Sequence, residues 1–131
     1  MTELPRQWLR FAAVGVLNTA VGLGAIYALM FFWDAKPVLA NVGGYAIGLT
    51  VSFAFNRSWT FGSRRSVSDV LPKYLAVVAA SYVLNLASVV AATASRAPAN
   101  PYMAQLLGIG IYTVGTFFGC RWFVFPPLRQ A

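Results

Sequence analysis

Two arginines stand at the ends of long apolar runs, each beside aromatic residues. Arg57 lies between Asn56 and Trp59, and Arg121 follows Cys120 sixty-four positions further along, again among aromatic rings. A guanidinium is always charged and directs two parallel hydrogen bonds onto phosphate oxygens. In a membrane, cations snorkel to the lipid boundary and aromatic rings lie at headgroup level. These positions therefore predict contacts with an anionic phosphate at a membrane surface.

Carboxamide and hydroxyl side chains interrupt the apolar runs. Such groups both donate and accept hydrogen bonds, which suits sugar hydroxyls. Each feature also has a purely structural interpretation. Amides link packed membrane helices, and boundary arginines and aromatic rings anchor a chain in the bilayer. The candidate binding residues are Asn18, Asn41, Asn56, Arg57, Trp59, Ser81, Asn85, Gln105 and Arg121.

Acidic groups and histidine are missing from the apolar runs. Glu3, Asp34 and Asp69 all lie outside them, and the sequence contains no histidine and one cysteine. No side chain in a run could therefore exchange a proton within a membrane. The sequence also shows no nucleophile–base pair, no cluster of metal ligands and no glycine-rich phosphate loop. We expect no catalytic activity, no cofactor and no metal site.

The composition is that of a membrane protein. Of 131 residues 59% are hydrophobic and only 10% are charged, whereas a soluble domain carries about 25% charged residues. The net charge of +7 is spread in short clusters between apolar runs. A nucleic-acid-binding protein would instead gather its charge on one solvated face, so we expect no nucleic-acid partner.

The charges divide the sequence into four uncharged runs, each near the roughly 20 residues that a helix needs to cross a bilayer. We predict an all-α membrane protein of one domain, residues 1–131. The gap at 34–37 is short enough to require an antiparallel hairpin. Residues 62–72 are expected to form a polar interfacial loop, and Pro98 and Pro101 a stiff turn. The predicted spans are residues 11–33, 38–56, 74–95 and 102–120.

A stripe of small residues recurs at every fourth position of the second run and reappears sixty-four positions later in the fourth. We therefore predict two parallel two-helix repeats, which enter the membrane in the same direction and are related by an axis along its normal. The stripes contain Gly44/Gly48, and Gly115/Gly119 lies beside the second, so both pairs are predicted dimerisation faces. The matching positions are Ala40, Gly44, Ser52 and Asn56 with Ala104, Gly108, Thr116 and Cys120.

Small residues also flank the amide of the first run. Gly15 and Gly22 share a helical face with Asn18 and are predicted to let a second backbone approach that amide.

Eight of the ten cations fall on one side of the predicted spans. Only Lys36 and Arg96 fall on the other side. The positive-inside rule then places both termini and the central loop in the cytoplasm. The eight are Arg6, Arg10, Arg57, Arg64, Arg65, Lys73, Arg121 and Arg129.

The residues from Trp8 to Phe125 resemble the GtrA-like family of small bacterial four-helix membrane proteins. The resemblance is carried by Arg10-Phe-x-x-x-Gly-x-x-Asn-Thr, by Ala40-Asn41 and by Ser52-Phe-x-x-Asn-Arg-x-Trp-Thr-Phe61. It implies a multi-pass protein of the bacterial inner membrane. It further implies translocation of a polyprenyl-phosphate-linked sugar for the synthesis or modification of cell-surface polysaccharide. The second copy departs from the motif at Cys120 and Phe123.

Three classes of function compete. The first is a flippase for polyprenyl-phosphate sugars, working as a homodimer or larger assembly because four spans hardly enclose a polar path. The second is a non-transporting accessory subunit that anchors or recruits a membrane glycosyltransferase. The third is a small multidrug antiporter, which ranks last because it would need a carboxylate within the membrane.

Overall fold

The computed structural model describes residues 3–94 and 101–127. Within these residues all regular structure is helical, and the chain divides into two compact units, one up to Arg64 and one from Arg65. The elements are α1 (Glu3–Phe32), α2 (Pro37–Phe55), η1 (Asn56–Thr60), α3 (Val67–Ala94), α4 (Pro101–Gly119) and η2 (Cys120–Val124).

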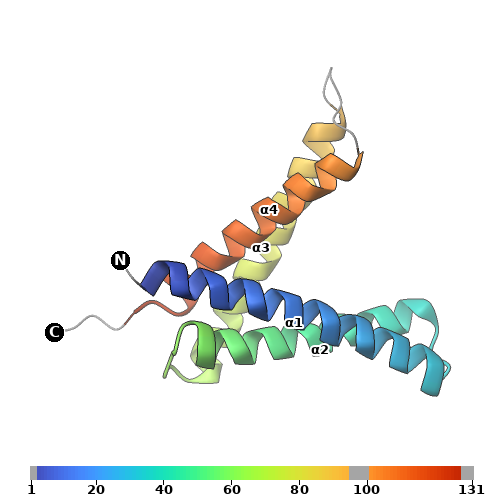
Figure 1. Cartoon of the computed structure of the whole chain (residues 1–131), viewed down its shortest axis with the longest axis horizontal. Helices are drawn as coiled ribbons and strands as arrows, with labels where there is room; N and C mark the ends of the chain where they lie inside the picture. The colour runs from blue at the N-terminus through green and yellow to red at the C-terminus, as the bar shows by residue number, and fades with distance from the viewer. Residues whose placement is uncertain (1–2, 95–100, 128–131) are drawn as a thin grey trace. The chain divides into compact units, whose positions relative to one another are not determined.

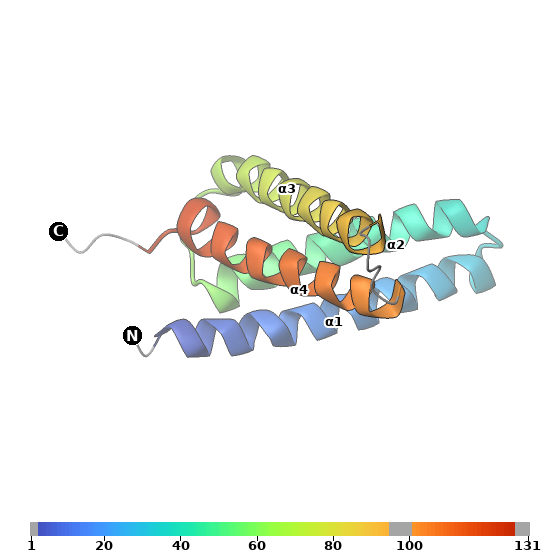
Figure 2. The same ribbon diagram turned by 90° about the horizontal axis from the view of Figure 1, so that it is seen from above.

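The first unit is an antiparallel hairpin of α1 and α2, which lie side by side in both ribbon views (Figures 1 and 2). Asp34 takes a positive φ of 51° in the turn, and the Ala35 N–H donates to the Leu29 carbonyl at 3.1 Å. Pro37 then begins α2, because the first helical position has no intrahelical partner for an N–H. The predicted tight turn is confirmed.

The second unit pairs α3 with α4. Its helix α3 begins at Val67, so the expected loop over 62–72 is too long. The reason is local: the Ser66 carbonyl already accepts the first hydrogen bonds of the helix, from the Asp69 and Val70 N–H groups at 3.1 and 3.2 Å. Pro72 lies inside the helix.

The connection between α3 and α4 lies outside the described residues, as do Arg96, Pro98 and Arg129. The described part resumes at Pro101, which begins α4 rather than ending a turn before it. Proline fits there because its fixed φ suits the first helical position.

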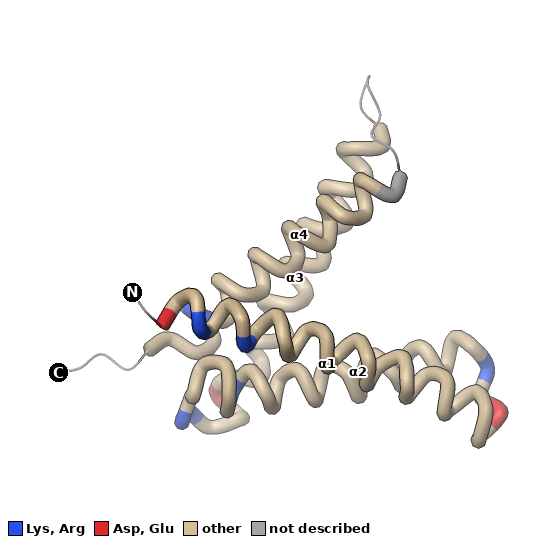
Figure 3. Tube along the Cα trace, in the orientation of Figure 1, with Lys and Arg blue, Asp and Glu red and all other residues tan. Residues whose placement is uncertain are grey.

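Four helices are long and apolar enough to cross a membrane, judged by length and composition. They run over Glu3–Phe32, Pro37–Thr60, Val67–Ala94 and Met103–Val124. This confirms an all-helical protein with four candidate spans; where the lipid begins along each helix stays a prediction. In each hairpin the charged residues lie towards the helix ends and the middle carries none (Figure 3).

The small-residue stripe of α2 packs against α1 within the hairpin. Ala40, Gly44 and Gly48 are buried, and a Cβ added to Gly44 would lie 2.9 Å from the Gly22 carbonyl oxygen. The close approach expected at Gly22 is therefore present. The one expected at Gly15 is wrong, because a Cβ there would meet nothing within 4 Å.

The glycine pairs predicted as dimerisation faces point into their own hairpins. In the first unit, Gly44 meets Ile26 and Gly48 meets Asn18. In the second, Cβ atoms added to Gly115 and Gly119 would lie 3.1 Å from the Ser81 hydroxyl and 2.5 Å from a Val77 methyl. These glycines already pack against α1 and α3, so the prediction that they form a dimer contact is wrong. The GxxxG pattern reports close helix packing without saying which helix is the partner.

Candidate functional site at the two π-helical turns

Helices α2 and α4 both end in a π-helical turn of five residues, η1 and η2, that start sixty-four positions apart. The Phe61 N–H donates to the Asn56 carbonyl at 3.0 Å, and the Phe125 N–H to the Cys120 carbonyl at 2.7 Å. Both bonds span five residues, the π-helical spacing. Such turns are rare and occur frequently at functional sites, and these two carry both predicted phosphate-binding arginines.

The two turns end differently. After η1, Gly62 adopts a left-handed φ of 57°, and the Ser63 N–H reaches back to the Arg57 carbonyl at 2.7 Å. A glycine in this conformation is a common helix end, because it carries no Cβ to clash. After η2 the chain enters Pro126, which has no N–H for such a bond.

A buried ladder of three polar side chains stabilises the first turn. The Asn56 amide Nδ2 donates to the Ser52 hydroxyl at 3.2 Å, and the Thr60 hydroxyl donates to Asn56 Oδ1 at 2.9 Å. Asn56 is only 1% exposed and Thr60 2%. Asn56, a predicted substrate-binding residue, therefore lies inside the hairpin end, where both ends of its amide are hydrogen-bonded to α2 and η1.

The second turn has lost this ladder. Thr116, Cys120 and Val124 occupy the equivalent positions and are all buried. The Thr116 hydroxyl is the one buried side-chain polar atom without a hydrogen-bond partner among the described residues. A hydroxyl left without a partner costs stability. The two ends thus share a backbone shape and differ in their polar interior.

Arg10 of α1 joins the first turn from across the hairpin. Its Nη1 donates to the Trp59 carbonyl at 2.9 Å, and its guanidinium carbon lies 5.3 Å from the centre of the Trp59 ring. The carbonyls of a final helical turn lack intrahelical partners and form the negative end of the helix dipole. Arg10 thus acts on that end by charge, hydrogen bond and ring contact.

The second hairpin has a simpler version of this contact. Lys73, near the start of α3, places its Nζ 5.5 Å from the centre of the Phe123 ring. Phe123 is the counterpart of Trp59, and Lys73 falls one position short of matching Arg10 exactly. Arg10 makes a hydrogen bond and a ring contact at its turn. Of these two kinds of contact, Lys73 makes only the ring contact among the described residues.

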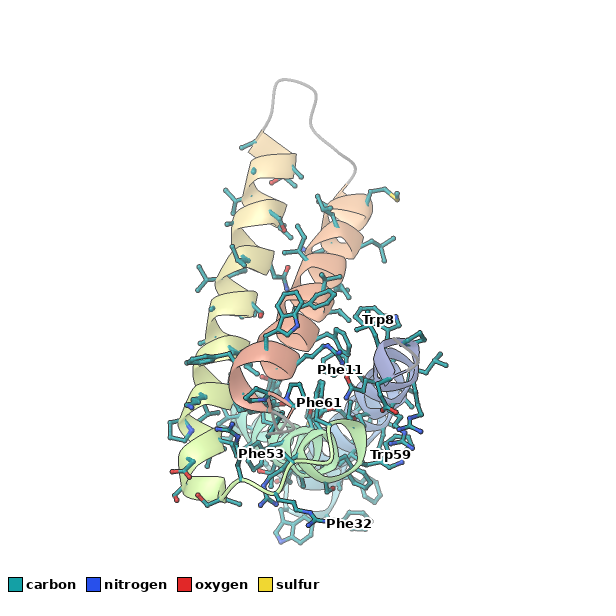
Figure 4. All side chains as sticks on the ribbon, turned by 90° about the vertical axis from the view of Figure 1, so that its left-hand side faces the viewer. Trp8, Phe11, Phe32, Phe53, Trp59 and Phe61 are labelled. Atoms are coloured by element: carbon teal, nitrogen blue, oxygen red, sulfur yellow. The ribbon has the colours of Figure 1, made fainter. Side chains whose placement is uncertain are left out.

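Arg57 and Trp59 point to different flanks of η1. Asn56 and Thr60 face the hairpin interior, and residues two apart in a helical turn do not face each other. Arg57 is half-buried, whereas Trp59 is 44% exposed and contacts Arg10. Figure 4 views this end of the hairpin with Trp59 and Phe53 on opposite sides of the ribbon. By helical geometry, the two predicted binding residues therefore leave η1 in different directions.

The amides Asn18 and Asn85 lie in the helix contacts, each against a glycine. A Cβ added to Gly48 would lie 2.5 Å from Asn18 Oδ1, and one added to Gly108 would collide with Asn85 Oδ1. Asn85 sits about one turn later in its helix than Asn18, and Gly108 one turn earlier than Gly48. In an antiparallel pair these two displacements compensate, so both hairpins keep an amide against a glycine.

Asn41 and Gln105 occupy equivalent positions and are exposed near the starts of α2 and α4. Along α2, Asn41 lies seven residues before Gly48, which Asn18 contacts, and Asn56 lies eight residues after it. At about 1.5 Å per residue, these polar groups are spread over roughly 20 Å. Within the first hairpin the predicted sugar-binding residues are thus distributed along the helices rather than gathered in one site.

Three residues at the turns were not among the predicted site residues: Arg10, Thr60 and Lys73. Thr60 had a sequence signal in the spacing Ser52, Asn56, Thr60, because residues four apart share a helical face. From the sequence, Arg10 is a topological cation and the first residue of the family motif, and Lys73 is a topological cation. Arg10 lies near the start of α1 and Lys73 near the start of α3. In an antiparallel hairpin the start of the first helix lies beside the end of the second.

Four helices of membrane-spanning length, with charged residues towards the helix ends (Figure 3), define a multi-pass membrane protein. The chain belongs to the GtrA/DPMS transmembrane domain family, whose sequence model matches residues 10–125. It is similar to the bactoprenol-linked glucose translocase of Salmonella phage P22, with 25% identity over 120 residues, which covers 92% of this chain and 95% of the relative. No solved structure matches the chain.

Proposed function

We propose that this protein translocates a polyprenyl-phosphate-linked sugar across the bacterial cytoplasmic membrane, for the synthesis or modification of cell-surface polysaccharide. The observation that carries the proposal is the similarity to a bactoprenol-linked glucose translocase over almost the full length of both chains. The family membership over residues 10–125 and the four candidate spans agree with it. The protein is proposed to act as a transporter and not as an enzyme.

The phosphate of the carrier lipid is assigned to Arg57 and Arg121. Each lies half-buried in a π-helical turn at a helix end, where the lipid phosphate would reside. The buried Ser52–Asn56–Thr60 ladder supports this assignment at the first turn, because it fixes the backbone from which Arg57 extends. Asn56 would then act on the phosphate through its neighbour.

The sugar is assigned to the amides and to Trp59. Asn18 and Asn85 lie inside the hairpins, whereas Asn41 and Gln105 are exposed nearer the opposite helix ends. Amides at several depths offer donors and acceptors to hydroxyls along the route of a crossing headgroup. Each contact replaces water that the headgroup loses, which offsets part of the cost of bringing polar groups into lipid.

The two hairpins are proposed to be copies of one unit that enter the membrane in the same direction. The paired π-helical turns, the paired cation–aromatic contacts and the paired amide–glycine contacts support this. With the positive-inside rule, the turns η1 and η2 and both termini would face the cytoplasm.

A homodimer or larger assembly is proposed because four spans hardly enclose a path for a polar headgroup. The contact must use surfaces other than the glycine stripes, since these pack within the hairpins. Native mass spectrometry from mild detergents should show dimers or larger species; monomers under every condition would contradict the proposal.

An accessory role is the second candidate: the protein would anchor or recruit a membrane glycosyltransferase without moving lipid. The observation that favours it is the large apolar surface of the helices, whose membrane windows are only 6% to 28% buried. Such surface is available to another membrane protein as well as to lipid.

Leaflet exchange in vesicles separates the two candidates. Purified protein is reconstituted with a fluorescent polyprenyl-phosphate glucose, and dithionite, which does not cross the bilayer, bleaches the outer leaflet. A translocase should make the inner-leaflet label accessible over time. Continued protection of that label, with bleaching restored only when a glycosyltransferase is added, would favour the accessory role.

A further inference from the structure

We infer that Arg10 is a positioning residue that latches the start of α1 onto η1 and thereby fixes the turn that carries Arg57. The latch itself is a structural inference; its consequence for phosphate binding rests on the proposed function. The contact joins residues 49 positions apart and is made by side-chain hydrogen bond and by ring contact at once.

The hydrogen bond acts on a carbonyl that a helix end leaves without a partner. Arg10 Nη1 lies 2.9 Å from the Trp59 oxygen, in the last π-helical turn before Gly62 reverses the chain. A cation at this place is attracted by the negative end of the α2–η1 dipole. Arg10 therefore stabilises the turn from outside while the Ser52–Asn56–Thr60 ladder stabilises it from inside.

The ring contact fixes the flank on which Trp59 lies. The guanidinium carbon is 5.3 Å from the centre of the indole ring, within the range of a cation–π contact. Because Trp59 and Arg57 are two residues apart in the turn, fixing one flank also fixes the direction of the other. Loss of the latch would remove the outer of the two supports of this turn and leave the direction of Arg57 less well fixed.

Carboxylates do not compete for Arg10 in the first hairpin. Glu3 is engaged by Arg6, whose Nη2 lies 2.6 Å from Glu3 Oε2, and Asp34 lies in the turn at the far end of α1. The Arg10 contacts to Trp59 use one of five guanidinium donors, so the latch does not consume the whole hydrogen-bonding capacity of the side chain.

The second hairpin supplies a matched control. Lys73 lies over Phe123 at 5.5 Å, so Lys73→Gln removes an equivalent charge near the start of α3. The hydrogen bond and the ring contact to Trp59 both come from Arg10, so we expect the first turn to stay intact in this variant.

The first arm of the test reads the latch without any lipid substrate. In a variant that keeps Trp59 as the one tryptophan (Trp8, Trp33 and Trp122 each replaced by phenylalanine), Arg10→Gln should shift the Trp59 emission and raise its acrylamide quenching. Arg10→Lys should restore part of both, because it keeps the cation over the ring. Lys73→Gln should change neither. Unaltered Trp59 emission in Arg10→Gln would overturn the latch, provided that the variant elutes as wild type in size exclusion.

The second arm is a double-mutant cycle on binding of polyprenyl phosphate. If Arg10 acts through Arg57, Arg10→Gln should weaken binding on its own and add nothing to Arg57→Lys. Additive losses would reduce Arg10 to an independent contact and overturn its positioning role. Should Arg57→Lys bind as wild type while the Trp59 signal still responds to Arg10→Gln, the latch stands and the phosphate assignment of Arg57 fails.

Discussion

At the scale of single residues, the planar fork of Arg57 distinguishes a phosphate ligand from a membrane anchor. Arg57 is half-buried in η1, on a turn held by the buried Asn56. A topological anchor needs only a positive charge, and the positive-inside rule counts lysine and arginine alike. A phosphate ligand loses its second parallel hydrogen bond when arginine becomes lysine.

Arg57→Lys should therefore weaken binding of polyprenyl phosphate about tenfold, the loss of one charge-assisted hydrogen bond of roughly 1.5 kcal/mol. Expression and membrane insertion should stay normal. Binding is measured by titrating purified protein in detergent with the labelled lipid. Arg121→Lys is the companion variant and should have a smaller effect, because its turn lacks the polar ladder. Wild-type binding by Arg57→Lys would leave the arginine as an anchor.

Replacement of the two buried threonines, Thr60 and Thr116, is predicted to change the stability in opposite directions. Thr60 donates to Asn56 Oδ1 at 2.9 Å, whereas the Thr116 hydroxyl has no partner within the described residues. Thr60→Val should cost about 1 kcal/mol or more, since it leaves a buried amide oxygen without its donor. Thr116→Val should gain about 1 kcal/mol, because it removes a buried hydroxyl that nothing satisfies. Thermal unfolding in detergent would show the two midpoints move apart, and a loss at Thr116 would contradict the asymmetry.

At the scale of the elements, each hairpin is stabilised by close helix contact rather than by a large core. The α1–α2 crossing depends on glycines whose missing Cβ atoms let the backbones meet. Lipid solvates apolar side chains as well as a neighbouring helix does, so close packing and hydrogen bonds provide the association energy.

Gly44→Ala should loosen the first hairpin by about 1–3 kcal/mol. Its Cβ would lie 2.9 Å from the Gly22 carbonyl oxygen, which belongs to backbone and has little freedom to move. Gly24→Ala is the control, because its Cβ would meet nothing within 4 Å. Denaturation by increasing SDS in mixed micelles measures both variants. Equal stability of the two would argue against the observed crossing.

At the scale of the whole molecule, the proposed orientation in the membrane rests on charge and not on packing. In each hairpin the described cations lie towards the helix ends (Figure 3), and the short Gly62–Ser66 connection between the units carries Arg64 and Arg65. Retention of such a loop in the cytoplasm is the general behaviour of short basic segments.

A cysteine at Ser68, exposed in the first turn of α3, should resist an impermeant maleimide added to intact cells and react after lysis. The native Cys120 is buried, so wild-type protein gives the blank. Labelling of Ser68→Cys in intact cells would reverse the proposed orientation of the termini.

The sequence by itself determined that this is a four-helix membrane protein with cations and aromatic rings at its helix ends. Both properties depend on residues close together in the chain: an uncharged run of the right length, then a boundary cation. The predicted polar loop after Gly62 is too long, because the helical hydrogen bonds of α3 already begin at the Ser66 carbonyl. The family motif was likewise readable, since each of its three segments is a short stretch of the sequence.

Only the tertiary structure decided what these residues meet. The glycines of α2 face α1 and not a second copy, and Arg10 reaches a carbonyl 49 positions away. The π-helical turn sends Arg57 and Trp59 to different flanks and lines up Ser52, Asn56 and Thr60 in one ladder. The physical reason is that a periodic pattern fixes the face of a helix, whereas the register between two helices and the pitch of a final turn depend on contacts between distant residues.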